Sequence, residues 1–501
     1  MLRSNVFFAR LLGGILAVLS AASGLCHAAE QKPIWLAVAE ADLSPALKPL
    51  AEKRRSDGFE VVVSTETIKA ALAALPRRPQ FLLLVGSDES GKELRLPAKR
   101  MKLYRWRDVQ PKEFLSDMAW GDLDGDGTPD IPVGRIPART PADVDHVVAK
   151  ILAFESQPPS SADLQIPVWL GSPEYTPAVN ALASGFAVTM FQTGGPPWLR
   201  PWFVSGNPGD PFCGWPPNQP ARFTEQLQKG SVASVLMGHA NAHLFFSMTV
   251  DRRPIFYTAA SAAKTLAQGP PAAPMFFFSC NSGNFGSPSP CEAEKFLQLP
   301  GGPVAVVAAT TESHPLANYY SSVCLLKAIG GRESRLGALW LTAQHEAKQS
   351  HNVLIESVLS DVEGKLEPQI DVAKLQRDQT LMFAILGDPA TRLRLPEPLE
   401  ATIESTNTGW RWKAKRPPGA VHLEVGYRAL QPRLPSWEGL RAGEKKATQA
   451  SDAANAAFAF APIPSPADDG PWQGDVERSG WIRLVTHDAH RLYVAVLKAG
   501  L

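Results

Sequence analysis

The sequence predicts an α/β protein built on a parallel sheet, followed by a small all-β sandwich. From residue 34 onward, short apolar runs alternate with segments of helical periodicity, which is typical of parallel strands covered by helices on both faces. After residue 396, short segments of alternating apolar and polar residues favour antiparallel strands. At 501 residues the chain is also too long for a single core, so we expect two or three domains.

Charge is nearly balanced, with 50 Lys plus Arg against 49 Asp plus Glu. Proteins that bind nucleic acid or anionic membranes usually carry a clear excess of positive charge. We therefore expect no nucleic-acid partner.

The N-terminus has the pattern of a secretory signal peptide. Arg3 and Arg10 precede an apolar run at residues 11–19, and small residues follow as far as Ala28. We expect cleavage after Ala28, so that residues 1–28 form the signal peptide. The mature protein is then exported, to the periplasm, the cell surface or the medium.

Two alternatives to cleavage are open at this terminus. An uncleaved membrane anchor is disfavoured because the apolar run is shorter than the roughly 20 residues that a span needs. Lipidation of Cys26 is disfavoured because bulky Leu25 precedes it, where lipidation sites carry a small residue. We expect no stable membrane insertion once the signal peptide is removed.

Residues 29–165 form the predicted N-terminal α/β lobe. Its apolar runs are short and end at Gly, Ser or Asp, which favours buried strands. Strands are expected at residues 34–39, 59–64 and 81–85, with helices at residues 44–55 and 67–75.

An acidic loop in this lobe resembles a calcium-binding loop. Asp122, Asp124 and Asp126 stand at alternate positions, and Asp130 follows, so hard oxygen ligands could gather around one calcium ion. Val133 occupies the twelfth position, where a complete EF-hand loop has an acidic residue. A solvated acidic turn is the alternative.

Residues 166–396 form the second predicted α/β lobe, and residues 397–501 the β-sandwich. A Pro- and Trp-rich stretch at 194–219 is expected to be a surface loop, and an Ala- and Pro-rich stretch at 443–469 a long mobile loop. In the second lobe we expect strands at 168–170, 233–237, 275–278, 303–309 and 381–386, and helices at 176–191, 319–329 and 336–349; in the sandwich we expect strands at 402–405, 410–414, 421–427, 481–486 and 492–497.

Two of these strands end on reactive side chains. The run at 233–237 leads into Gly238 and His239, and the run at 275–278 leads into Ser279 and Cys280. In parallel sheets the ligand crevice lies beyond the carboxyl ends of the strands. His239 and Cys280 are therefore expected side by side, where the imidazole can activate the thiol.

This pairing would make Cys280 a nucleophile. A thiol with a pKa near 8.5 is mostly protonated at neutral pH, and a neighbouring imidazolium lowers that pKa. The tight turn after Cys280 would point backbone N–H groups toward a developing oxyanion. The alternative is an inert core cysteine, which is common in apolar runs.

Other Cys and His residues compete for these roles. Cys291 begins a predicted helix at 292–297, whose dipole could lower the thiol pKa, so it is the second candidate nucleophile. His243 lies four residues after His239, the spacing of a two-His metal site on a helix, although Gly238 and Asn241 favour a loop there. His314, His345 and His351 follow no strand and are expected at the surface; Cys213, Cys280, Cys291 and Cys324 could form two disulfides in an oxidising compartment.

Several linked motifs resemble the gingipain family of cysteine peptidases, which belongs to the caspase-like clan. They are Ser-Cys-Asn-Ser-Gly-Asn-Phe at 279–285, Pro-Cys-Glu-Ala-Glu at 290–294 and Gly-Pro-Val-Ala-Val-Val-Ala-Ala-Thr at 302–310. The likeness covers roughly residues 33–396. It implies a caspase-like α/β fold, a Cys-His dyad, protein or peptide substrates and an immunoglobulin-like domain after the catalytic lobe. Further matching segments are 116–117, 121–127, 133–138 and 386–390.

The resemblance also implies roles for single residues. Cys280 matches the family's nucleophile, His239 its general base, and Glu174 the acid that orients the histidine. A carboxylate there would fix the imidazole tautomer, whereas the alternative is an ordinary loop carboxylate. The oxyanion hole would use the backbone N–H groups of Cys280 and Ala240.

Two departures from the family stand out. Ala240 replaces the glycine that usually follows the histidine, and a positive φ at this position would be costly for alanine. The segment after Glu174 lacks the Asp-bearing loop of the arginine-specific members, so we do not expect cleavage after Arg. The sequence thus predicts a secreted cysteine endopeptidase; the alternative is a non-catalytic secreted relative that serves as a binding or assembly module.

Overall fold

The computed structural model describes residues 31–87, 96–104, 113–357 and 371–500. The predicted signal peptide lies outside these residues. The described residues from 33 onward form one compact unit. None of the helices in the described part of the chain is long and apolar enough to cross a membrane.

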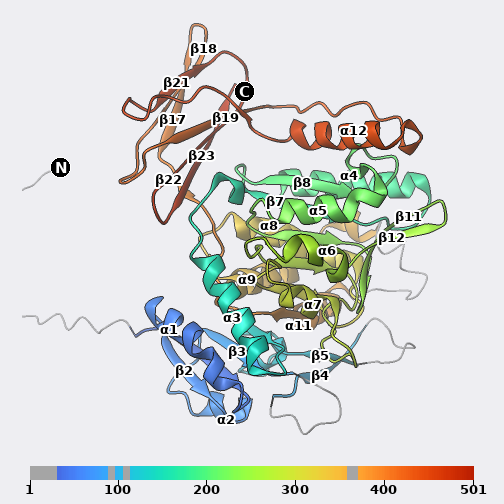
Figure 1. Cartoon of the computed structure of the whole chain (residues 1–501), viewed down its shortest axis with the longest axis vertical. Coiled ribbons are helices and arrows are strands. Elements are labelled where there is room, and N and C mark those ends of the chain that lie inside the picture. The colour runs from blue at the N-terminus through green and yellow to red at the C-terminus, as the bar shows by residue number, and fades with distance from the viewer. Residues whose placement is uncertain (1–30, 88–95, 105–112, 358–370, 501) are drawn as a thin grey trace, which may run out of the picture. The chain divides into compact units, whose positions relative to one another are not determined.

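A ten-stranded sheet forms the centre of the α/β part (Figure 1). Five strands of one half are parallel to one another, and so are five strands of the other half. The halves meet at β14 and β15, which pair antiparallel, so the sheet is mixed. In spatial order the strands are β2 (Glu60–Ser64), β1 (Ile34–Ala39), β3 (Phe81–Val85), β6 (Val133–Ile136), β15 (Phe383–Leu386), β14 (Val306–Ala309), β13 (Met275–Phe278), β9 (Ser234–Met237), β7 (Gln165–Leu170) and β8 (Arg200–Ser205).

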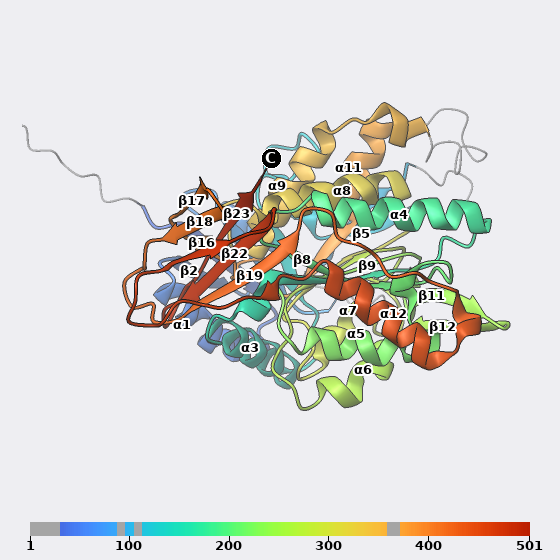
Figure 2. The ribbon, with the colours of Figure 1, turned by 90° about the horizontal axis from the view of Figure 1, so that it is seen from above.

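Helices cover both faces of this sheet, as expected. Figure 2 shows α4, α8 and α9 on one side of the strands and α3, α5 and α6 on the other. The helices are α1 (Lys48–Ser56), α2 (Ile68–Ala73), α3 (Pro141–Glu155), α4 (Pro177–Thr193), α5 (Gln219–Leu227), α6 (Ala259–Leu266), α7 (Glu292–Gln298), α8 (Pro315–Ile329), α9 (Leu336–Gln349) and α11 (Val372–Met382).

The phenylalanines of β13 show how one strand serves two cores. Phe277 packs on the face of α5, α6 and α7, whereas Phe276 and Phe278 pack on the opposite face. There both rings lie near Trp340 of α9, with centroid distances of 5.5 and 6.1 Å. Successive side chains of a strand point to opposite faces, so a strand buried on both sides is apolar throughout.

The stretch at 194–219 is not a surface loop, so that expectation is wrong. It contains β8, in which Trp202 and Phe203 are buried. Pro201 interrupts the apolar pattern, but β8 is the edge strand of the sheet, where a missing N–H is tolerated.

The C-terminal region contains two sheets, in agreement with the predicted sandwich, and their strands pair antiparallel except for β16, which pairs parallel with β23. One has the order β16-β23-β22-β19-β20 and the other β17-β18-β21, and Trp412 is buried in their shared core. Its immunoglobulin-like character stays a prediction. The strands are β16 (Glu397–Pro398), β17 (Ala401–Thr406), β18 (Gly409–Ala414), β19 (Leu423–Ala429), β20 (Ala461–Pro462), β21 (Gln473–Val476), β22 (Gly480–His487) and β23 (Leu492–Ala499).

The stretch at 443–469 was expected to be a mobile loop, which is wrong for its first half. It contains α12 (Glu444–Ala457), which lies against β8. The Asn455 side chain accepts a hydrogen bond from the Phe203 N–H at 2.7 Å and donates one to the Phe203 carbonyl at 3.0 Å. The helix thereby pairs backbone groups that an edge strand would otherwise expose.

Candidate active site

Three neighbouring strands end at the same edge of the sheet. β13, β9 and β7 are adjacent and parallel, and Phe278, Met237 and Leu170 align in one row across them. The Gly238 N–H donates to the Phe278 carbonyl at 3.3 Å, so the pairing extends beyond this row. Cys280 and His239 follow directly on neighbouring strands, as the sequence predicted.

The turn after β13 holds Cys280 in place. Asn281 has a φ of 58°, a left-handed conformation that few non-glycine residues adopt. Its N–H donates to the Thr311 carbonyl at 2.9 Å, and the Gly283 N–H donates to the Ala309 carbonyl at 2.9 Å. Two hydrogen bonds, one to the last residue of β14 and one to the segment that follows it, thus anchor the backbone after the thiol.

Cys280 differs from the other described cysteines in its exposure. It is partly exposed, with its Sγ 3.8 Å from the Ser313 carbonyl, whereas Cys213, Cys291 and Cys324 are buried. All four are free thiols, so the structure shows none of the disulfides considered from the sequence. Among the described cysteines, Cys280 alone is accessible to a substrate.

Cys291 does not have the environment of a nucleophile. It caps α7, as predicted, but its side chain is fully buried. Burial raises the pKa of the Cys291 thiol well above its usual value, and the negative charge of Glu294 raises it further. The expected lowering by the helix dipole is therefore wrong, because burial and Glu294 outweigh it.

His239 directly precedes a small antiparallel sheet at the edge of the main one. It is exposed, and its carbonyl accepts a hydrogen bond from the Phe246 N–H at 2.9 Å. The sheet consists of β10 (Ala240–Asn241), β11 (Leu244–Val250) and β12 (Arg253–Tyr257). His243 lies in the turn between β10 and β11, so it shares no helix with His239.

Buried polar contacts fix this small sheet to the main one. The Ser172 N–H donates to the Ser247 carbonyl at 2.6 Å, next to the end of β7. The Trp169 indole N–H donates to the Ser247 hydroxyl at 3.0 Å, and that hydroxyl donates to Gln219 Oε1 at 2.7 Å. β11 is therefore held from two sides, which positions β10 and the residue before it, His239.

Ala240 is not strained. The described non-glycine residues with positive φ are Glu174, Asp251, Arg252 and Asn281. Ala240 instead pairs with Phe245 in β10, one residue after the hydrogen-bonded position of His239. Since hydrogen-bonded pairs alternate in an antiparallel ladder, the Ala240 N–H faces away from β11. The conformational cost considered from the sequence does not arise.

Glu174 reaches the same edge of the sheet, after the end of β7. It is exposed and has a φ of 57°. Its carboxylate lies 3.5 Å from the Thr249 hydroxyl of β11. The structure thus places Glu174 beside the small sheet that carries His239, and gives its carboxylate a contact with that sheet.

His314 was expected at the surface, which is wrong. It is only 3% exposed, next to the Ser313 carbonyl that contacts Cys280. Its Nδ1 accepts the N–H of Leu316 at 3.1 Å and so caps α8. Pro315 directly after it, a residue favoured at the first helical position, was the available signal. His345 is half-buried, with Nε2 3.0 Å from the Pro129 carbonyl, whereas His351 is exposed.

The acidic loop before β6 gathers three carboxylates into one cluster. One oxygen each from Asp122, Asp124 and Asp130 lie within 4.8 Å of one another. The Asp126 carboxylate instead accepts the Thr128 N–H at 2.7 Å. The described loop therefore offers a three-carboxylate cluster rather than the four-residue set expected from the sequence.

The fold is that of known cysteine proteinases. The Arg-specific cysteine proteinase gingipain R aligns with a TM-score of 0.53 and 11% identity, over 93% of this chain and 97% of that one. The complex of the RgpB pro- and mature domains from Porphyromonas gingivalis aligns with a TM-score of 0.51 and 11% identity, over 93% and 99%. A structure described as a protease aligns with a TM-score of 0.51 and 15% identity, over 93% and 97%. At such low identity these matches establish the caspase-like fold alone.

Membership of a family follows from the sequence itself. The family model of peptidase family C25 matches residues 28–394, well over half of the chain. The chain therefore belongs to peptidase family C25, the gingipain family of cysteine peptidases. No curated protein sequence matches it significantly.

Proposed function

We propose that the protein is an exported cysteine endopeptidase in which Cys280 and His239 form the catalytic dyad. The observation that carries this proposal is the placement of the accessible thiol and the imidazole at the ends of two adjacent parallel strands. Membership of the family makes proteins or peptides the substrates. The signal-peptide pattern at residues 1–28 supports export.

The proposed reaction begins with proton transfer from the Cys280 thiol to the His239 imidazole. The thiolate attacks the substrate carbonyl carbon, and the carbonyl π electrons move to its oxygen. Collapse of this tetrahedral intermediate breaks the C–N bond, and the imidazolium gives its proton to the leaving amine. Water, deprotonated by His239, then hydrolyses the thioester and releases the acid product.

The backbone N–H groups of Cys280 and Ala240 are the proposed oxyanion hole. The outward direction of the Ala240 N–H, away from β11, supports this role. Oxyanion donors of this kind typically contribute about 3–4 kcal/mol to the activation barrier. Because the N–H belongs to the backbone, alanine can supply it as well as glycine.

Glu174 is proposed as a positioning residue for His239. Its contact with Thr249 holds it beside the small sheet, and a carboxylate near the imidazole would favour the charged form that develops during thiol deprotonation. The substitution Glu174→Gln should lower kcat more than it raises KM, and shift the acidic limb of the pH profile.

Peptide hydrolysis by paired histidine variants tests the dyad. His239→Ala should lower kcat/KM by at least about a hundredfold, because general acid–base catalysis is lost. His243→Ala is the matched control, since this exposed histidine lies in the adjacent turn, and its activity should stay near wild type. Equal loss in both variants would contradict the assignment.

The alternative function is a non-catalytic binding or assembly module on the same scaffold. The absence of the family's Asp-bearing specificity loop after Glu174 is the observation in its favour. Such a protein would hydrolyse no peptide, and its Cys280→Ala variant would bind partners like wild type.

A structural calcium ion is proposed at Asp122, Asp124 and Asp130. Carboxylate oxygens are the ligands that calcium prefers, and three converge here. Calcium should raise the melting temperature of the wild-type protein. The double substitution Asp122→Asn and Asp124→Asn should abolish this effect, whereas Asp126→Asn should largely retain it. A calcium effect that survives the double substitution would remove the ion from this loop.

A further inference from the structure

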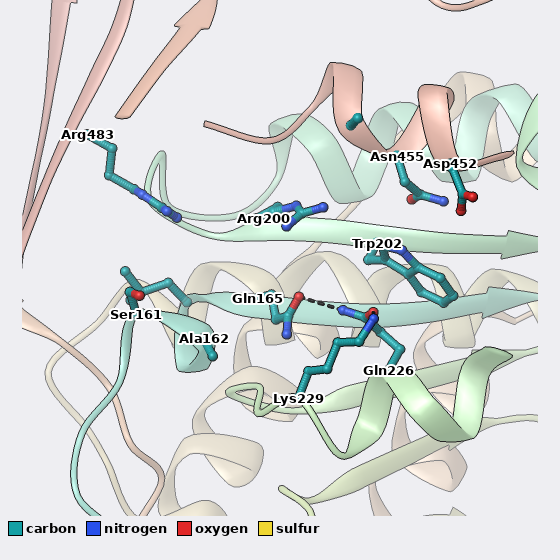
Figure 3. Close-up of a pocket in the computed structure, with 12 residues that line it drawn as sticks. Ser161, Ala162, Gln165, Arg200, Trp202, Gln226, Lys229, Asp452, Asn455 and Arg483 are labelled. Atoms are coloured by element: carbon teal, nitrogen blue, oxygen red, sulfur yellow. Dashed lines mark hydrogen bonds between the residues drawn. The ribbon is translucent and has the colours of Figure 1, made fainter. Parts of the chain in front are cut away.

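A pocket of about 460 Å³ lies between the main sheet and the C-terminal region (Figure 3). Its walls come from the edge strand β8 and its neighbour β7, from the end of α5, and from α12 and β22. The pocket lies outside the candidate active site: the catalytic residues proposed above do not line it. Its charged and amide-bearing lining residues include Arg200, Arg483, Lys229, Asp452, Gln165 and Gln226.

Three cations from three different elements face this pocket. Arg200 belongs to β8 and Arg483 to β22, and both residues are half-buried, whereas Lys229 follows α5 and is exposed at the rim. Within the described part of the chain, none of the three forms a salt bridge. The Nε atoms of Arg200 and Arg483 are buried without a hydrogen-bond partner among the described residues.

Nearby acidic groups do not balance this charge. Asp452 lines the pocket, but it is mostly exposed and pairs with Arg222. Glu424 on β19 acts on Arg483 only through its charge and forms no salt bridge with it in the described structure. Burial lowers the pKa of Arg200, and burial together with the positive charges of Arg200 and Arg428 lowers that of Arg483 to about 10. Buried positive charge without a counter-ion is unfavourable, so the pocket favours a bound anion.

The amide groups of the pocket are already engaged. Gln226 donates to Gln165 Oε1 at 2.7 Å, Gln165 donates to the Gly230 carbonyl at 2.6 Å, and Asn455 is bound to the Phe203 backbone. Besides the Ser161 hydroxyl and the Trp202 indole N–H, the donors that line the pocket are guanidinium and ammonium N–H groups, of which the Lys229 Nζ also donates to Gln226 Oε1 at 3.2 Å. These groups recognise oxyanions, and guanidinium groups bind phosphate and sulfate oxygens with charge-assisted hydrogen bonds.

We propose that this pocket binds a phosphate or sulfate group, held by Arg200, Arg483 and Lys229. The volume exceeds what a free phosphate needs, so the group can be free or carried by a larger molecule such as a sugar ester. A bound anion joins β8 to β22 and thereby fastens the C-terminal region to the sheet that carries Cys280.

Thermal unfolding of the mature Cys280→Ala protein measures this binding without interference from self-cleavage. Sodium phosphate and sodium sulfate are titrated against sodium chloride at equal ionic strength. Glucose 6-phosphate and a sulfated disaccharide form a second arm, which separates the free anion from an esterified one. We expect a saturable rise in melting temperature with phosphate or sulfate, and tighter binding of an ester if a larger ligand is the natural one.

Charge-neutralising variants locate the site. Arg200→Gln, Arg483→Gln and Lys229→Gln should each weaken the binding at least tenfold. Arg428→Gln is the matched control, because Arg428 stacks on the same Phe460 ring as Arg483, at 4.6 against 4.7 Å, but does not line the pocket. Its anion affinity should stay within twofold of wild type.

Failure of this proposal is distinguishable from failure to fold. Lys229 is exposed, so Lys229→Glu should fold normally and abolish the anion effect. Three results would overturn the proposal and leave only a non-specific salt effect. They are no saturable rise in melting temperature in the parent protein, an equal rise in Lys229→Glu, and a loss of anion affinity in Arg428→Gln equal to that in the pocket variants. The inference does not depend on peptidase activity.

Discussion

Gly283 lies in the turn that positions Cys280, and its replacement by alanine should damage both stability and reactivity. A Cβ at Gly283 would lie 2.6 Å from the Ala308 carbonyl oxygen and 2.8 Å from the Ala308 Cβ. The first distance is roughly 0.8 Å shorter than ordinary van der Waals contact, and the obstacle is backbone rather than a flexible side chain. The turn must therefore move away from β14.

The cost follows from this geometry. Movement would weaken the hydrogen bond from the Gly283 N–H to the Ala309 carbonyl, now 2.9 Å long, and shift the thiol from its position beside β9. Overpacking of this kind costs about 1–3 kcal/mol, and the lost hydrogen bond adds to that. We expect Gly283→Ala to lower the free energy of unfolding by about 2–3 kcal/mol and to slow the alkylation of Cys280.

Urea unfolding and the alkylation rate with iodoacetamide measure the two effects. Gly185→Ala is the matched control, because Gly185 lies within α4, where an added Cβ meets no atom within 4 Å. Alanine is the better helix former there by about 1 kcal/mol, so this variant should be slightly more stable. If Gly283→Ala matched wild type in both stability and alkylation, the close packing of the turn against β14 would not hold Cys280 in place.

Two further predictions concern buried polar side chains. Lys150, which donates to the carbonyls of Leu297 and Leu299, is buried, and burial lowers its pKa to about 7. Between pH 7 and 10 the Lys150 side chain is protonated in the unfolded chain but not in the native protein. The free energy of unfolding should therefore rise with pH, by up to about 1.4 kcal/mol per pH unit relative to the Lys150→Met variant. Urea unfolding of both proteins at pH 7 and pH 9 measures this difference. Asn455→Ala should lower the free energy of unfolding by about 1–3 kcal/mol for each Phe203 backbone group left without a partner, and a loss below 0.5 kcal/mol in chemical denaturation would contradict the role of α12 as cover for β8.

The sequence was most informative where local pattern and burial coincide. Apolar runs predicted β1, β3 and β13 with the bounds that the structure shows, because strands buried on both faces cannot be polar anywhere. The ends of β9 and β13 followed from the same logic, and with them the neighbourhood of His239 and Cys280. β8 was missed because Pro201 interrupts its apolar pattern. α12 was missed because its alanine-rich sequence shows no clear periodicity of apolar and polar residues.

Tertiary packing decided what the sequence left open. The sequence offered two nucleophile candidates, Cys280 and Cys291, and the hydrophobic pattern does not indicate which of the two thiols is buried. Full burial of Cys291 and the charge of Glu294 separate them in the structure. The conformation of Ala240 likewise depends on β11, which pairs with it, and the short alternating pattern of β11 was not recognised from the sequence.

Labelling by a thiol-reactive peptide probe can show whether Cys280 is the nucleophile of a cysteine peptidase. The mature protein is incubated with an acyloxymethyl ketone peptide probe, and the modified residue is identified by peptide mass spectrometry. We expect a single label on Cys280, lost in Cys280→Ala, strongly reduced in His239→Ala and retained in Cys291→Ala. A label on another cysteine, or one that persists in Cys280→Ala, would contradict the assignment, and the absence of any label would favour the non-catalytic module.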